Sequence, residues 1–386
     1  MQFSALIITL ALIAGQIIKI PIGTGSGASF IDVLIVVLCL TGLLKIRLKL
    51  TKPDLFIYSG LAFTIIAVIS LTLTPLHLLP KEYFSAFLYT IRFFSYILLG
   101  WLLKSNAFPF ITTGIEKILL FSGVFLGAIG LLQFVILPDL RFLSQFGWDP
   151  HFYRTVSAFL DPNFLAAYLV LTLLVIFQNE LDLKTVQRNV LFTLVYLTLM
   201  TTFSRSGYLM FLISFLCISF FKKSLKIALF SFVLFTGLLF FFQLYIKGVN
   251  QLTPLDRNQT AGYRFTTWQQ GEDIFLKSPV LGVGFNAYNF ALREYKLGTE
   301  QFVNGHGATT NDSSLLYVAS TTGTFGLIAY GFFLFALIRE HKKKPILAAG
   351  TLGLIANSIF INSLFYPFII TWLILYASKE YENKNK

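Results

Sequence analysis

The chain has 386 residues, of which 56% are hydrophobic and only 12% are charged. A soluble domain carries about twice that charged fraction, so the composition excludes a soluble globular protein. The formal net charge of +12 does not indicate nucleic-acid binding, because the basic residues lie in short loops between apolar runs, as in oriented membrane proteins.

Apolar runs long enough to cross a bilayer recur from one end of the chain to the other. We therefore predict an all-α polytopic membrane protein, a single integral membrane domain over residues 1–386 with about 12 transmembrane helices. The final two runs are short, and they are equally consistent with one re-entrant pair. The predicted spans are 4–20, 28–44, 55–74, 83–103, 112–137, 160–178, 189–203, 206–221, 227–246, 312–338, 346–361 and 363–378.

The loops between these spans divide into a basic set and a less basic set, which predicts the orientation of the chain. Basic loops are retained in the cytoplasm, so both termini are expected there. The segments 138–159, 204–207 and 247–311 then lie on the extracytoplasmic side. The basic loops are 45–49, 184–188, 222–223, 339–344 and 379–386.

The stretch 247–311 is the one large extracytoplasmic loop of this arrangement. Residues 264–276 are expected to form a short amphipathic helix lying on the membrane. The Gly-x-Gly at 282–284 lacks the strand-turn-helix context of a phosphate loop and indicates a tight turn. His306 lies between two glycines, which makes it accessible; it is a candidate catalytic residue or an ordinary loop residue.

Arginine is concentrated in the predicted outer loops, whereas lysine dominates the basic loops. Orientation needs only positive charge, but the planar arginine fork also suits phosphate and carboxylate groups. The distribution therefore predicts an anionic ligand at the outer face. The outer-loop arginines are Arg141, Arg154, Arg205, Arg257, Arg264 and Arg293.

Two short motifs at the predicted outer ends of spans each allow a structural and a functional interpretation. In Asp161-Pro162-Asn163, Asp161 suits a helix N-cap and Pro162 a first helical position, but a helix N-terminus near Arg154 and Asn163 is also an anion site. In the turn after residue 203, Arg205 is either an interfacial anchor or a ligand-binding residue.

Arg92 lies near the middle of a predicted span, where an ionised side chain is costly and is a functional candidate. The alternative is pairing with a polar partner such as Glu116, or snorkelling to an interface. The sequence contains no nucleotide-binding loop and no Cys/His cluster for zinc, so we expect neither ATP-driven transport nor a metal or other cofactor.

Several of these motifs occur in the order found in one family of membrane proteins. The order is Arg154 with Asp161-Pro162-Asn163, the Ser-Arg-Ser-Gly turn at 204–207, Arg264-x3-Trp268 with Gly282-x-Gly284, and His306 with Asp312-Ser313-Ser314 and Gly323-x2-Gly326. In the order of these motifs, the chain resembles the O-antigen ligase and O-antigen polymerase superfamily of bacterial envelope glycosyltransferases. The resemblance covers a core region of about 150–335.

The resemblance implies a GT-C-like glycosyltransferase in the bacterial plasma membrane, with its active site outside the cytoplasm. It implies an undecaprenyl-diphosphate-linked glycan as donor, a glycan or lipid as acceptor, and metal-independent transfer. By position, Arg205 and Arg264 match the arginines that hold the donor diphosphate, with Arg154, Asn163 and Arg92 as further substrate-binding candidates.

His306 matches the family histidine that activates the acceptor, but it lies six residues before Asp312, whereas in many members the histidine adjoins the helix start. Asp312 is therefore the alternative catalytic base. A ligase and a polymerase differ in the acceptor, and the sequence does not distinguish them. The rival from another class is a multi-span transporter of an anion or a lipid-linked glycan, which should show two related halves; no internal repeat is evident.

Overall fold

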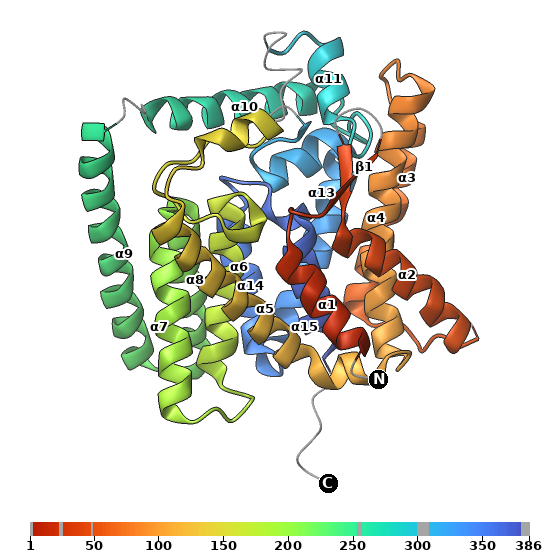
Figure 1. The fold of residues 1–386 in the computed structure, drawn as a ribbon. Coiled ribbons are helices and arrows are strands. Elements are labelled where there is room, and N and C mark those ends of the chain that lie inside the picture. The colour runs from red at the N-terminus through yellow and green to blue at the C-terminus, as the bar shows by residue number, and fades with distance from the viewer. Residues whose placement is uncertain (1–2, 23–25, 48, 253–256, 299–308, 380–386) are drawn as a thin grey trace.

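The computed structural model describes residues 3–22, 26–47, 49–252, 257–298 and 309–379. These residues form a helical bundle, with one helix, α10, lying across one end of it (Figure 1). The helices are α1 (Phe3–Ala14), α2 (Phe30–Lys45), α3 (Leu55–Thr72), α4 (Pro80–Lys104), α5 (Pro109–Ile136), α6 (Pro162–Gln178), α7 (Thr185–Thr202), α8 (Arg205–Lys222), α9 (Leu225–Leu252), α10 (Arg257–Lys277), α11 (Tyr288–Glu294), α13 (Ser314–Arg339), α14 (Pro345–Asn357) and α15 (Pro367–Ser378).

Short elements connect these helices. A two-stranded antiparallel sheet follows α1, with Lys19 opposite Ser29 and Ile22 opposite Ser26 in its register. The sheet consists of β1 (Lys19–Ile22) and β2 (Ser26–Ser29), and the short 3₁₀ helices are η1 (Arg141–Phe146), η2 (Ser157–Phe159), η4 (Glu340–Lys342) and η5 (Ser363–Phe365).

Six of the described helices are long and apolar enough to cross a membrane, which supports the prediction of a multi-pass membrane protein. A helix begins within each of the twelve predicted segments or a few residues before it. Four more apolar helices, among them α1, α14 and α15, are shorter than a full span. The total of twelve spans therefore stays a prediction.

The predicted span 4–20 is wrong in its second half. The helix α1 has 12 residues, or about 18 Å of helix, which is shorter than the roughly 30 Å apolar core of a bilayer. The chain turns at Gly15, whose φ is +56°, and residues 19–22 then pair as β1 with β2. Pro21 and the glycines that follow favour such a hairpin over a continuing helix.

Helix starts follow from short local signals in the sequence. Proline occupies the first turn of α4, α5, α6, α14 and α15, where its missing N–H costs nothing. Side-chain oxygens cap four helices by accepting backbone N–H groups of the first turn. These caps are Asp54 on α3, Asp161 on α6, Ser204 on α8 and Ser313 on α13.

The helix α13 is interrupted at Gly323, whose φ is +64°, and the segment before α11 packs into the interruption. Backbone N–H groups of Val283 and Gly284 donate to the carbonyls of Ser320 and Thr321, at 3.1 and 3.0 Å. The predicted turn at 282–284 is confirmed, since Gly282 and Gly284 have φ of +69° and +104°. The large loop is thereby fixed to α13.

The helix α10 confirms the helix predicted at 264–276 and begins seven residues earlier. One face of α10 is buried against the bundle end. The buried residues of this face recur at helical spacing and are Thr267, Gln270, Gly271 and Ile274. The helices α1 and α15 have their first and last residues, respectively, at the other end of the bundle (Figure 1). The loop helix therefore closes the end opposite to both termini.

Candidate functional site

Three helix N-termini meet beneath α10. Ser204, the cap of α8, donates from Oγ to Oδ1 of Asn163 in the first turn of α6, at 2.9 Å. Thr267 of α10 donates to Oδ2 of Asp312, just before α13, at 2.9 Å. Helix N-termini carry partial positive charge and unpaired N–H groups, so their convergence favours an anion.

Two of the predicted arginines lie at this convergence. Arg205 is the first residue of α8 and is exposed, and Arg264 projects from α10 and is half-buried. Burial lowers the pKa of Arg264, the charge of Arg205 lowers it further, and the charges of Asp312 and Asp161 raise it. The charges of three residues thus reach Arg264, and we call Asp161, Arg205, Arg264 and Asp312 the arginine junction.

Neither arginine of the junction is neutralised by direct contact with a residue that the structure describes. Within the described residues, Arg205 and Arg264 form no ion pair and no side-chain hydrogen bond. Two cations held close together, one of them half-buried, repel each other and lose hydration. An anion bound between them relieves both effects.

Of the two carboxylates in the junction, Asp312 is the candidate catalytic base. Burial raises its pKa, while the hydrogen bond from Thr267 and the charge of Arg264 oppose that rise. A carboxylate with a raised pKa accepts a proton more readily near neutral pH than an ordinary aspartate. The neighbouring Asn311 fixes this segment, donating from Nδ2 to the carbonyl of Thr267 and to the hydroxyl of Tyr288.

Close packing of α10 on this segment depends on Gly271. A Cβ at Gly271 would lie 2.6 Å from Nδ2 of Asn311, which is closer than real contacts allow. The small residue therefore lets α10 approach the start of α13. This approach brings Arg264 and Thr267, one helical turn apart, over Asp312.

The structural interpretation of Asp161 is confirmed. Its Oδ1 accepts the backbone N–H groups of Asn163 and Phe164, at 2.6 and 3.0 Å, and Pro162 begins the helix. Burial raises the pKa of Asp161, and those N–H bonds and the charge of Arg154 oppose the rise. The cap also orients Asn163 toward the turn that carries Arg205.

Arg154 lies beside the junction and contacts the end of α7. Its Nε donates to the carbonyl of Thr202 at 2.9 Å, and one Nη lies 3.5 Å from the carbonyl of Phe203. The guanidinium therefore binds the carbonyl-rich end of a helix, where cations are stabilising. Part of its hydrogen-bonding capacity is committed to the fold.

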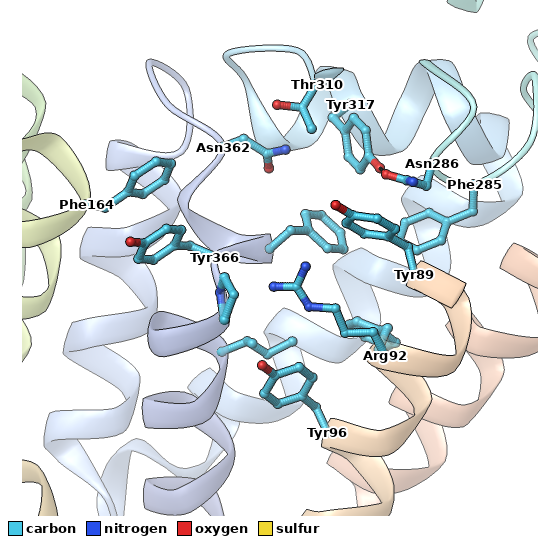
Figure 2. Close-up of a pocket in the computed structure, with 14 residues that line it drawn as sticks. Tyr89, Arg92, Tyr96, Phe164, Phe285, Asn286, Thr310, Tyr317, Asn362 and Tyr366 are labelled. Carbon is cyan, nitrogen blue, oxygen red and sulfur yellow. Dashed lines mark hydrogen bonds between the residues drawn. The ribbon is translucent and has the colours of Figure 1, made fainter. Parts of the chain in front are cut away.

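Arg92 does not pair with Glu116, contrary to the alternative derived from the sequence. Its Nε donates to Oδ1 of Asp32 at 2.8 Å, while Glu116 contacts Lys379. Arg92 lines a separate cavity of about 170 Å³ among aromatic rings (Figure 2). Asp32 was not anticipated because it lies 60 residues away on another helix, α2.

His306 lies outside the described residues, since the structure does not describe 299–308. The choice between His306 and Asp312 as base is therefore not narrowed by geometry. In the part of the chain that is described, no group of three or more His, Cys, Asp or Glu side chains is placed to bind a metal ion.

Sequence reasoning missed residues that support the junction. Thr267 follows Arg264 by three positions, and helical periodicity would have placed the two side chains on one face of α10. Asp149 was also missed, although its charge raises the pKa of both Asp161 and Asp312. Because Asp149 lies in an irregular segment, no periodic pattern indicates its position.

Comparison with known families gives one match. Residues 190–331 match the family model described as O-antigen ligase. The matched segment runs from α7 into α13 and contains Arg205, Arg264 and Asp312. The predicted resemblance to the O-antigen ligase and polymerase superfamily is thereby confirmed. No curated protein matches the chain.

Proposed function

We propose that this protein is a membrane glycosyltransferase that transfers or polymerises a glycan from an undecaprenyl-diphosphate-linked donor at the outer face of the bacterial plasma membrane. The observation that carries the proposal is the arginine junction. The charge of Arg205 reaches Arg264, and neither arginine has an ion-pair partner among the described residues. A diphosphate supplies the negative charge that this pair lacks.

In this proposal the junction binds the diphosphate and also stabilises it as the leaving group. In the proposed reaction, an acceptor hydroxyl oxygen attacks the anomeric carbon of the donor sugar, and the bond from that carbon to the diphosphate oxygen breaks. Undecaprenyl diphosphate leaves with the bonding electrons. Arg205 and Arg264, together with the N-terminus of α8, stabilise the negative charge that develops on it.

The acceptor hydroxyl must lose a proton in this step, and Asp312 or His306 accepts it. Asp312 is within the junction, has a raised pKa and is oriented by Thr267. A histidine at position 306 is suited by its ordinary pKa near 6.5. Attack from the side opposite to the diphosphate inverts the configuration at the anomeric carbon.

An apolar surface leads to the junction. Only 17% of the apolar stretch of α9 between Leu225 and Val249 is buried. Aromatic and aliphatic side chains cover its exposed face. Tyr245 near the end of α9 stacks on Phe203 at a centroid distance of 3.9 Å, and Phe203 adjoins Ser204. A polyprenyl chain lying along such a surface would bring its diphosphate to the junction.

The proposal is tested by binding of the lipid product. The purified chain in lipid nanodiscs should bind undecaprenyl diphosphate more tightly than undecaprenyl monophosphate, as measured by native mass spectrometry. Each Arg→Gln substitution at 205 or 264 should weaken diphosphate binding about 10- to 100-fold, since a charge-assisted hydrogen bond contributes roughly 1.5–3 kcal/mol.

Arg141→Gln is the matched control, because Arg141 also lies in an outer segment but pairs with Asp139 at 2.6 Å. Equal binding of the two lipids, or equal losses in all three variants, would contradict the proposal. Turnover separates an enzyme from the transporter alternative. A deletion strain complemented with Arg264→Gln should lack glycan attachment or show altered chain length while lipid-linked glycan still reaches the outer face.

A further inference from the structure

A second polar feature, the Arg92 cavity, lies deeper in the bundle than the arginine junction. It has a volume of about 170 Å³, is partly open, and is lined by α4, by the start of α6, by the residues before α11, and by the segments around the starts of α13 and α15 (Figure 2). The lining includes Arg92, Phe164, Thr310, Asn362 and Tyr366. Because α15 begins only at Pro367, Arg92 of α4 lies level with the first turn of α15 and faces this recess.

Two residues that line the cavity each carry a buried polar atom with no partner among the described residues. These atoms are one Nη2 donor group of Arg92 and the Oδ1 acceptor of Asn362. Buried donors and acceptors are nearly always hydrogen-bonded in folded proteins, so unpaired ones mark a place where a bound group completes the bonding. Figure 2 shows both side chains directed into the same space from opposite sides.

The charge of Arg92 is already compensated. Asp32 accepts Nε of Arg92 at 2.8 Å, the hydroxyl of Tyr96 at 2.7 Å, and the N–H and hydroxyl of Ser29. No other charged residue lines the cavity among those described. Lys19, whose charge also interacts with Arg92, holds its ammonium over the ring of Trp148. The site therefore offers a donor and an acceptor without net charge.

The remaining walls are aromatic. Phe164 and Tyr366 stack in parallel at a centroid distance of 4.0 Å, and Phe285, Tyr89 and Phe93 add further ring surface. A ring with apolar C–H faces and hydroxyl groups at its edge is complementary to such walls and to the two polar atoms. Since one water-sized group needs roughly 10–15 Å³, the cavity has room for on the order of ten such groups, which is the size of one sugar ring.

The cavity adjoins the arginine junction. Phe164 follows Asn163 in α6, and Thr310 lies two residues before Asp312. Tyr366 lines the cavity and stacks on Phe164, the residue that follows Asn163. A glycan whose diphosphate or acceptor hydroxyl lies at the junction thus extends naturally into the cavity.

We propose that the Arg92 cavity binds one uncharged pyranose residue of the glycan, with Nη2 of Arg92 donating to a sugar oxygen and Oδ1 of Asn362 accepting from a sugar hydroxyl. The proposal rests on the proposed function, since it places this sugar beside the reacting centre. It narrows the substrate to a glycan with a neutral residue next to the transferred bond.

The direct test is saturation-transfer NMR on the full chain in lipid nanodiscs, using methyl hexopyranosides as the neutral probe and a methyl hexopyranosiduronate as the charged probe. We expect transfer to a neutral glycoside and at least about tenfold weaker binding of the uronate. Asn362→Leu keeps the Arg92–Asp32 pair and should weaken neutral binding about tenfold. The double substitution Arg92→Gln with Asp32→Asn, which preserves net charge, should do the same.

Tighter binding of the uronate, equal binding by wild type and both variants, or no transfer to any neutral glycoside would overturn the proposal. Undecaprenyl diphosphate binding separates this result from the proposed function: it should persist in Asn362→Leu and be weakened in Arg264→Gln. In a turnover assay, Asn362→Leu should raise the KM for the donor if the sugar belongs to the donor, and for the acceptor if it belongs there. An unchanged KM for both would also overturn it.

Discussion

The two ends of the bundle differ in how their charged side chains are paired. At one end, Arg205 and Arg264 repel each other with no ion pair to any described residue. At the other end, beyond the last turn of α6, the ammonium of Lys379 contacts the carboxylates of both Glu116 and Glu180. At the first end the charge has no ion-pair partner among the described residues, and at the second end it is paired within the fold.

We propose that this difference distinguishes ligand-binding residues from structural ones. A buried ion pair contributes little net stability, but removing one partner strands the other. An unpaired cation destabilises the apoprotein and gains a partner only when an anion binds. Substitutions at the two ends should therefore have opposite effects on stability and on activity.

The largest effect is expected from Arg264→Gln at the junction. Loss of one preorganised donor to a developing negative charge typically lowers turnover about 10²- to 10³-fold. The melting temperature should stay the same or rise, because the substitution removes repulsion with Arg205. Turnover and thermal unfolding of the same purified sample test this, with Arg141→Gln as control. A clear fall in melting temperature would show that Arg264 is structural.

Lys379→Met should have the reverse outcome at the other end. Leaving Glu116 and Glu180 without their shared cation should cost on the order of 2 kcal/mol in the free energy of unfolding. Undecaprenyl diphosphate binding per folded molecule should not change. Adding Glu116→Gln should recover part of the lost stability. If Lys379→Met abolished binding with stability intact, the contrast between the two ends would fail.

The pH dependence of turnover sharpens the contrast for Asp312. A base must be deprotonated, and burial raises the pKa of Asp312, so activity is present above that pKa and is lost as pH falls through it. The charge of Arg264 lowers this pKa; in Arg264→Gln the acidic limb should move to higher pH. Arg264→Lys should leave the limb in place. If the acidic limb of the pH profile does not move in Arg264→Gln and is absent in His306→Ala, the base is His306.

The smallest effect concerns the hydrogen bond that orients Asp312. Thr267→Val removes the hydroxyl donated to Oδ2 of Asp312 and should lower turnover about fivefold, equivalent to about 1 kcal/mol. Thr266→Val is the matched control, because the Thr266 hydroxyl bonds only within its own helix, to the carbonyl of Gly262. Equal turnover in the two variants would remove Thr267 from the site.

The sequence predicted the helices well because apolar runs, N-terminal prolines and capping residues are local signals. Pro162 and Asp161 mark the start of α6 as expected. The prediction failed at 15–22, where a glycine turn and a proline outweigh an apolar run that continues through the same residues.

The sequence indicated which residue types belong to the candidate site, but it did not indicate which side chains contact one another there. Arg205 and Arg264 were found from their type and from a family resemblance, and the structure brings them together. The pairing of Arg92 with Asp32 joins two helices distant in sequence, and the Arg92 cavity gathers side chains from five segments. Such contacts depend on tertiary packing, for which a single sequence carries no signal.

The interruption of α13 constrains how this protein can be recombined with relatives. A Cβ at Gly282 would lie 2.4 Å from the backbone of Thr321, and a Cβ at Gly323 would lie 2.2 Å from the carbonyl oxygen of Val280. The segments 279–284 and 320–325 therefore pack so closely that one cannot be exchanged without the other. A chimera that exchanges the large loop to alter glycan specificity should keep its architecture only if the first half of α13 is exchanged with it.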